Sequence, residues 1–162
     1  MEFKVYEQEI PVRDNDVYVS YETAQLLKEE GYNVPCAYAW IQHKNAAIPP
    51  TFYKNISRFN GVEERNSNHK RAITAPTQGN ANKWISDNLN ARVVVTPVAW
   101  ESQNKKENIP DIVWKFEVYS TQTASRFLVD ESFCYATPEE AMERGLVWCI
   151  VNKDMYYETV QR

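Results

Sequence analysis

Three segments of the chain repeat apolar residues with the period of an α-helix. The first covers 20–30, where Ser20 can act as the N-cap and the glycine at position 31 as the stop. The second covers about 76–89. The third begins at Thr137, which opens a capping box, and runs to about position 152. These patterns predict three helices. The second helix packs through one face: Ala81, Trp84, Ile85 and Leu89.

Strand patterns lie between the helices. The segments 36–41 and 92–100 are apolar and rich in aromatic or β-branched residues, and 51–56 is a shorter candidate. The segment 112–119 alternates apolar and polar positions most cleanly, and 126–135 is its expected partner.

The order of these elements predicts an α+β fold. We expect one domain over 1–162, with three helices packed on a largely antiparallel sheet, because no linker-like stretch divides the chain. Pro97 cannot donate a backbone hydrogen bond, so it should lie at a sheet edge or at a bulge. The segment 60–71 is polar and predicts a surface loop. A helix followed by strands occurs twice, although the residues hardly match.

Glycine content excludes several enzyme classes. The chain of 162 residues has only four glycines, and none is close enough to another to form a dinucleotide-binding turn, a P-loop or a nucleophile elbow. The rest of the composition is that of an ordinary globular domain, with 43% hydrophobic and 25% charged residues, and aromatic residues make up 13%.

Cysteine usage and charge indicate the compartment and the class of partner. Three cysteines without a C-x-x-C pair predict free thiols and no disulfides. The N-terminus lacks a signal-peptide pattern and no segment is apolar enough for a membrane span, so we expect a cytoplasmic protein. The net charge of −4 makes nucleic acid an unlikely partner, although a local basic patch is compatible with it.

Few residues carry a pattern typical of catalysis or metal binding. The potential zinc ligands lack metal-site spacing: Cys36, His43, His69, Cys134 and Cys149. None of the cysteines lies at a predicted helix N-terminus, where its pKa would fall. The sequence therefore predicts no metal, no cofactor and no catalytic residue, and it favours a non-enzymatic protein while leaving catalysis open.

A basic segment, 65–71, precedes the second predicted helix. Cations beside the free N–H groups of a helix N-terminus form an anion site, and two threonines could add hydroxyl donors. Gly79 would let a ligand approach the backbone. The predicted phosphate or nucleotide site consists of Arg65, His69, Lys70, Arg71, Thr74, Thr77 and Gly79. The alternative is a solvated basic loop.

Aromatic residues on the predicted strands also have two interpretations. Alternating rings on strands usually form a core, whereas rings left exposed would suit a partner surface. The rings concerned are Tyr38, Trp40, Phe52, Tyr53, Trp100 and Trp114.

Three helix-related motifs resemble a group of small bacteriophage and prophage proteins of gut bacteria whose function is unknown. They are 19–32, 75–78 with 83–85, and 135–141. The polar insert at 60–71 departs from the pattern of the group. The resemblance implies a phage setting and no reaction. We therefore expect a phage accessory protein that binds or modulates a host or phage component, with a phosphate-ligand-binding protein and a virion component as alternatives. The sequence does not specify the partner, the ligand or the oligomeric state.

Overall fold

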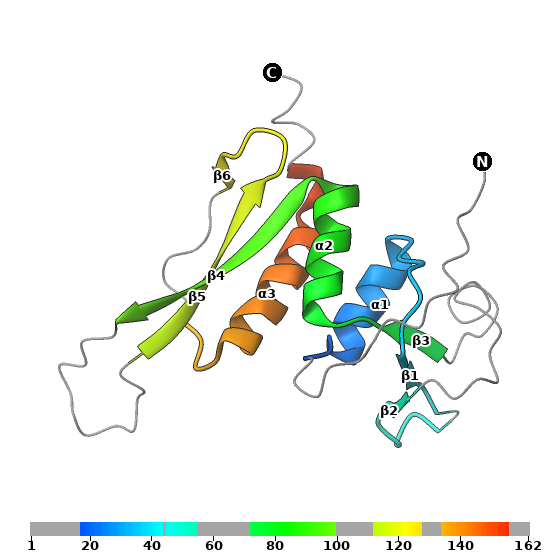
Figure 1. Cartoon of the computed structure of the whole chain (residues 1–162). Coiled ribbons are helices and arrows are strands. Elements are labelled where there is room, and N and C mark those ends of the chain that lie inside the picture. Colours follow the sequence, from blue (N-terminus) through cyan, green and yellow to red (C-terminus); the bar gives the residue numbers. More distant parts are fainter. Residues whose placement is uncertain (1–16, 44, 55–71, 100–111, 128–133, 156–162) are drawn as a thin grey trace, which may run out of the picture. The chain divides into compact units, whose positions relative to one another are not determined.

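The computed structural model describes residues 17–43, 45–54, 72–99, 112–127 and 134–155 (Figure 1). The chain forms two compact units, residues 1–77 and 78–162. The first unit contains α1 (Tyr21–Glu29), β1 (Tyr38–Ile41), β2 (Thr51–Lys54) and β3 (Ala72–Ala75). The second contains α2 (Gln78–Leu89), β4 (Ala91–Ala99), β5 (Ile112–Ser120), β6 (Arg126–Phe127) and α3 (Pro138–Val151). The α+β class is confirmed, and the single-domain organisation stays a prediction.

The first unit is an antiparallel sheet with one helix packed against it. The strand order is β2-β1-β3, so β1 is central, as its apolar sequence predicted, and α1 packs against β3. The predicted ends of α1 are confirmed: the Ser20 hydroxyl accepts a hydrogen bond from the Thr23 N–H at 3.2 Å, and Gly31 follows with a φ of +90°. A positive φ suits glycine because it has no Cβ.

Strand β3 corrects the prediction for the start of the second helix. The helix was expected from about 76, but 72–75 is a strand and α2 begins at Gln78, directly after Thr77. Pro76 biases the residue before it towards an extended backbone. Pairing with β1 then makes 72–75 a strand rather than the start of the helix, with Ile73 opposite Trp40.

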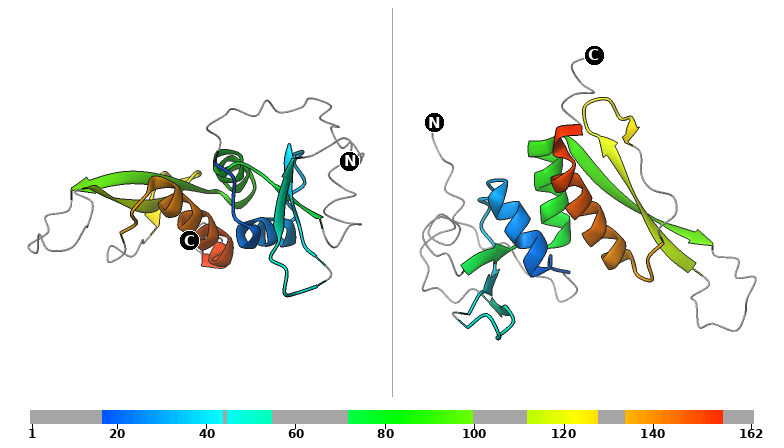
Figure 2. Two further views of the ribbon diagram at one scale, coloured as in Figure 1. Left: turned by 90° about the horizontal axis from the view of Figure 1, so that it is seen from below. Right: turned by 180° about the vertical axis from the view of Figure 1, so that it is seen from behind.

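The second unit has its own antiparallel sheet in the order β4-β5-β6, so the strands form two sheets of three rather than one. Strands β4 and β5 pair along their whole lengths, and α3 packs on both. Helix α2 packs on α3 and β4. Figure 2 shows α3 along one side of the β4–β5 pair. Pro97 lies in β4, which is at the edge of this sheet as predicted.

Gly145 brings α3 close to the sheet. A Cβ at this position would lie 2.4 Å from Val93 Cγ1 and 3.2 Å from the Phe116 ring. This contact could not be predicted from the sequence, because the helical pattern of α3 does not distinguish Gly145 from the other residues of the helix. The interface beside it is fully apolar, with Leu146, Cys149 and Val118 buried. Burial of one such aliphatic side chain contributes about 1.5–3 kcal/mol.

Asn82 in α2 and Asn90 directly after it fix the position of the edge strand β4. The Asn82 side chain donates to the Val93 carbonyl oxygen and accepts from the Val93 N–H, each at 2.9 Å. Asn90 follows α2 with a φ of 55° and leads directly into β4. Asparagine tolerates this left-handed conformation better than most residues, so the helix can stop and reverse without a loop.

The structure confirms the last predicted helix and describes only the two ends of the predicted strand 126–135. Strand β6 covers Arg126–Phe127, and Tyr135 pairs with Trp114 through two backbone hydrogen bonds of 2.8 Å. The positions between, 128–133, lie outside the described residues. Thr137 caps α3 by accepting from the Glu140 N–H at 3.1 Å, as predicted.

Candidate functional site

The predicted anion site is described only in part. Its four basic residues lie outside the described residues: Arg65, His69, Lys70 and Arg71. Thr74 lies in β3 with 2% of its surface exposed, and the backbone of Thr77 forms a bridge with Tyr18. Gly79 is exposed in the first turn of α2. The anion site therefore stays a prediction.

A carboxylate from α3 already lies at the start of α2. The Gln78 side-chain amide donates to Glu143 Oε2 and to the Glu139 carbonyl oxygen, both at 3.0 Å. Negative charge is favourable at a helix N-terminus, so Glu143 complements the dipole of α2. A phosphate at the same turn would be repelled by this carboxylate, which counts against the phosphate-ligand hypothesis.

The predicted aromatic stripe divides in the structure. Tyr38, Trp40 and Phe52 share one face of the first sheet, as the register of β1 and β2 requires. Tyr53 lies on the other face of this sheet, where it is in register with Ala39. Of the remaining two rings, Trp114 lies in β5 and Trp100 lies outside the described residues.

These three rings form an aromatic cluster with Tyr18 and Tyr21. Tyr38 stacks on Phe52 with centroids 4.9 Å apart and an interplanar angle of 4°. Tyr18 contacts both of them, at 4.7 and 5.2 Å, and Trp40 contacts Phe52 at 4.9 Å. All five rings are half-buried. Such mutual packing favours a core over a partner surface, because the rings bury apolar surface on one another.

Two polar details of the aromatic cluster support the same interpretation. Trp40 Nε1 donates to the Val19 carbonyl oxygen at 3.1 Å, which ties the ring to the segment before α1. Burial raises the pKa of Tyr21, whose hydroxyl is buried with no hydrogen-bond partner among the described residues. An unpaired buried hydroxyl costs about 1–3 kcal/mol, which the apolar contacts of the ring must offset.

Two of the residues considered as zinc ligands, Cys36 and His43, have other polar neighbours, and His69 lies outside the described residues. All three cysteines are free thiols; Cys36 Sγ lies 3.6 Å from the Tyr32 hydroxyl and Cys149 is buried in α3. Burial, with the neighbouring Cys36, raises the pKa of Tyr32. His43 Nε2 lies 2.5 Å from the Thr51 hydroxyl oxygen. Across the described ranges, His, Cys, Asp and Glu residues form no group of three that could hold a metal ion.

Helix α3 covers one face of the second sheet, and on the other face, which we call the open face, Arg92 and Val94 are exposed among the described residues. The closeness of Gly145 to Val93 and Phe116 shows that these two residues face α3. Side chains alternate along a strand, so the residues on either side of these two in the sequence face the other way. They are Arg92 and Val94 on β4, and Lys115 and Glu117 on β5. Residues in register confirm the division: Arg92 lies opposite Tyr119, Val94 opposite Glu117 and Thr96 opposite Lys115.

The open face carries a group of polar side chains that we call the sheet-face cluster. It consists of Arg92, Lys115, Glu117, Tyr119 and Arg126. Arg92, Tyr119 and Arg126 are in direct register across β4, β5 and β6. Neighbouring side chains in such a row have Cβ atoms about 4.5–5.5 Å apart. The row therefore places Tyr119 between two arginines.

Glu117 organises this cluster by accepting two hydrogen bonds. The Tyr119 hydroxyl donates to Oε2 and Arg126 Nη1 donates to Oε1, both at 2.8 Å. The bond from Tyr119, then that from Arg126, lowers the pKa of Glu117, and the same bond raises the pKa of Tyr119. Residues two apart on a strand are separated by about 6.6 Å, so a tyrosine hydroxyl reaches Glu117 only when its ring leans along the strand.

Arg92 completes the cluster as an exposed cation. It has no ion pair within the described part of the chain, whereas Arg126 is paired with Glu117. Lys115 lies on the same face, two residues before Glu117. The cluster therefore has three cations and one carboxylate, in a protein with a net charge of −4. The open face ends near Val113, which is buried.

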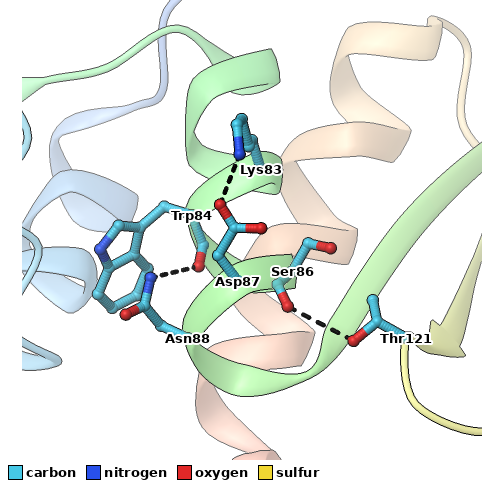
Figure 3. A network of polar contacts seen from close by, with 6 residues as sticks. All are labelled: Lys83, Trp84, Ser86, Asp87, Asn88 and Thr121. Atoms are coloured by element: carbon cyan, nitrogen blue, oxygen red, sulfur yellow. Dashed lines mark hydrogen bonds and ion pairs between the residues drawn. The ribbon is translucent and has the colours of Figure 1, made fainter.

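The polar contacts on α2 have a different character (Figure 3). Lys83 and Asp87 form an exposed ion pair of 2.6 Å one turn apart, and Asn88 donates to the Trp84 carbonyl oxygen at 2.9 Å. Thr121 approaches the Ser86 carbonyl oxygen at 3.5 Å. Exposed pairs within one helix contribute little to stability. The contacts in Figure 3 are thus an ion pair within α2, one side-chain bond to the helix backbone and one contact from the turn after β5.

Comparisons with known proteins return no relative. The chain matches no protein-family model, and no curated protein or solved structure is significantly similar to it. In the part of the chain that the structure describes, no helix combines the length and apolar character of a membrane span.

The sequence contained a signal for part of the sheet-face cluster. The alternation over 112–119 places Lys115, Glu117 and Tyr119 on one face of a strand. Arg92 and Arg126 could not be added, because their positions depend on the register of three strands.

Proposed function

We propose that this chain is a non-enzymatic binding protein of a bacteriophage or prophage, that it acts in the host cytoplasm, and that it binds its partner through the open face of the second sheet. The observation that carries the proposal is the sheet-face cluster. Its side chains are fixed by strand register and by the two hydrogen bonds to Glu117. The phage setting rests on the resemblance of the three helix motifs.

The open face suits recognition because it is already ordered. Side chains on paired strands lose less conformational freedom on binding than side chains on loops. Arginine and tyrosine are the residue types that carry much of the binding energy at interfaces. The opposite face of the same sheet is occupied by α3 and has no such role.

Site-specific photo-crosslinking tests this proposal. A photoreactive amino acid replaces Val94, which is 36% exposed on the open face, or Val151, which is 64% exposed on α3. The full chain is expressed in a bacterial host and irradiated. We expect a discrete adduct from position 94 and none from position 151. Absence of an adduct from position 94, or the same adducts from both positions, would contradict the proposal.

A further inference from the structure

We propose that the sheet-face cluster binds single-stranded nucleic acid, a statement that rests on the proposed function because it names the partner of the same face. The argument has three parts: a tyrosine ring on the central strand, cations on both sides of it, and a local charge opposite to that of the whole protein.

Tyr119 provides a surface for stacking. It lies on β5, the central strand, and its hydroxyl is held by Glu117 at 2.8 Å. The ring therefore leans along the strand and its orientation is fixed before any ligand arrives. Unpaired bases stack on aromatic side chains of this kind, and the interaction tolerates every base because each has a π-face.

Cations flank the ring at the spacing of the strands. Arg92 and Arg126 lie on either side of Tyr119, two strands and so about 10 Å apart. Lys115 adds a third cation on the central strand. Arginine suits phosphate oxygens because its planar guanidinium donates two parallel hydrogen bonds. A base on Tyr119 would then have a cation on each side: Arg92, which has no ion pair among the described residues, and Arg126, which Glu117 holds in place.

Local charge decides between an anionic and a neutral partner. Overall the protein is acidic, which argued against nucleic acid, but the cluster carries three positive side chains and one negative side chain. This excess of positive charge complements a phosphodiester backbone. A duplex presents stacked bases that Tyr119 cannot reach, so a single strand is the form that uses both the ring and the cations.

Fluorescence anisotropy with the full chain tests the inference. The probes are labelled oligonucleotides of about 15 nucleotides, as DNA, as RNA and as a DNA duplex. Titrations at about 50 and 200 mM salt give the salt dependence. The DNA and RNA arms show which sugar is preferred. We expect tighter binding to a single strand than to the duplex, with affinity falling as salt rises.

Matched variants separate the cluster from the net charge. Tyr119→Ala should weaken binding about tenfold, whereas Tyr119→Phe keeps the ring and should bind nearly as well. Arg92→Gln should weaken binding about fivefold and reduce the salt slope by about 0.7. Arg144→Gln is the control, because Arg144 is exposed on α3 and its loss changes the net charge equally. Circular dichroism verifies that each variant is folded.

The possible results distinguish the two proposals. Single-strand binding that is lost in Tyr119→Ala and Arg92→Gln but kept in Arg144→Gln supports the inference. No binding at low salt, or an equal loss in Arg144→Gln, overturns it. A protein adduct from position 94 without any oligonucleotide binding also overturns it, while the proposed binding function then stands with an acidic protein as the partner.

Discussion

Each of the two units of this protein begins with a helix and three strands, which α3 follows in the second unit, and the two sets of strands build different sheets. In the first unit β1 is central and pairs with both β2 and β3. In the second the middle strand of the sequence, β5, is also the middle strand of the sheet. The second unit is therefore not a topological copy of the first.

The lengths of the connections explain the difference. Strands β5 and β6 are joined by residues 121–125, a turn too short to place β6 anywhere except beside β5. Strands β2 and β3 are separated by 55–71, which is long enough for β3 to reach the other side of β1. Element order alone does not determine a topology; the connections do.

The sheets also differ in what they present. The first carries the aromatic cluster, whose rings pack on one another, and the second carries the sheet-face cluster, whose charges remain on the surface. Aromatic side chains were the stronger signal in the sequence, yet the charged face has the properties of a binding surface.

The largest expected effect compares the two cores. Leu27→Ala in α1 and Leu146→Ala in α3 each remove a fully buried side chain and should each lower the free energy of unfolding by about 2–5 kcal/mol. Urea denaturation measures the loss and hydrogen exchange locates it. The predicted single domain requires faster exchange in both units from either variant. Faster exchange confined to the mutated unit would show two domains.

Gly145 should be the next most sensitive position. Gly145→Ala places a Cβ 2.4 Å from Val93 Cγ1, so α3 or Val93 must shift, and we expect a loss of about 1–3 kcal/mol. Gly79→Ala is the matched control in an exposed helical turn and should raise stability by about 0.5–1 kcal/mol. Thermal denaturation measures both; a neutral Gly145→Ala would mean that the contact is loose.

Asn82 should contribute a comparable or smaller amount. Asn82→Ala leaves both backbone groups of Val93 without these partners and should cost about 1–3 kcal/mol. Asn88→Ala is the control on the same helix, since Asn88 is exposed and bonds only a carbonyl of its own helix. Equal denaturation midpoints for the two variants would refute this role of Asn82.

Substitutions at two positions with a positive φ should change the free energy of unfolding by smaller amounts, with opposite signs in the two units. Ala124 has a φ of 54° in the turn before β6, and Ala124→Gly should raise the free energy of unfolding by about 0.5–1 kcal/mol. Gly31→Ala, at a φ of +90° with open space around it, should lower it by about 1 kcal/mol through backbone strain alone. Changes of the same sign would contradict the argument.

The smallest effect is electrostatic and lies in the sheet-face cluster. The pKa of Glu117 is lowered below its ordinary value of 4.5, so its contribution to stability is complete above that pH and is lost as the pH falls through the lowered pKa. The pKa of Tyr119 is raised above 10.0, so its contribution is lost as the pH rises through the raised pKa.

Nuclear magnetic resonance titration tests this pairing. Tyr119→Phe and Arg126→Gln should each raise the pKa of Glu117 towards its ordinary value, because both side chains donate a hydrogen bond to its carboxylate. An unchanged pKa of Glu117 in either variant would contradict that bond.

Local signals in the sequence predicted the helices well. Ser20, Thr137 and Gly31 act within one turn of the chain, and each has the predicted role. Strand β3 was missed because its short sequence becomes a strand only by pairing with β1, which lies far away in the chain. Predictions failed where a residue depends on a partner that no local pattern specifies.

The candidate site shows the same limit. The polar side of β5 was visible as an alternation, but Arg92 and Arg126 join it through register across three strands. The contact of Gly145 with Val93 likewise requires knowledge of which strand α3 covers. The basic residues of 65–71 formed the more conspicuous pattern, and their site stays a prediction.

The hydrogen bonds from Asn82 also bear on how the protein behaves at high concentration. Strand β4 is a valine-rich edge, the kind of segment that recruits another molecule and starts fibril growth. At two positions its backbone has less to offer such a molecule, because Val93 is already bonded to Asn82 and Pro97 has no N–H to give. We therefore expect that loss of the Asn82 side chain or of Pro97 would make edge-to-edge association through β4 easier.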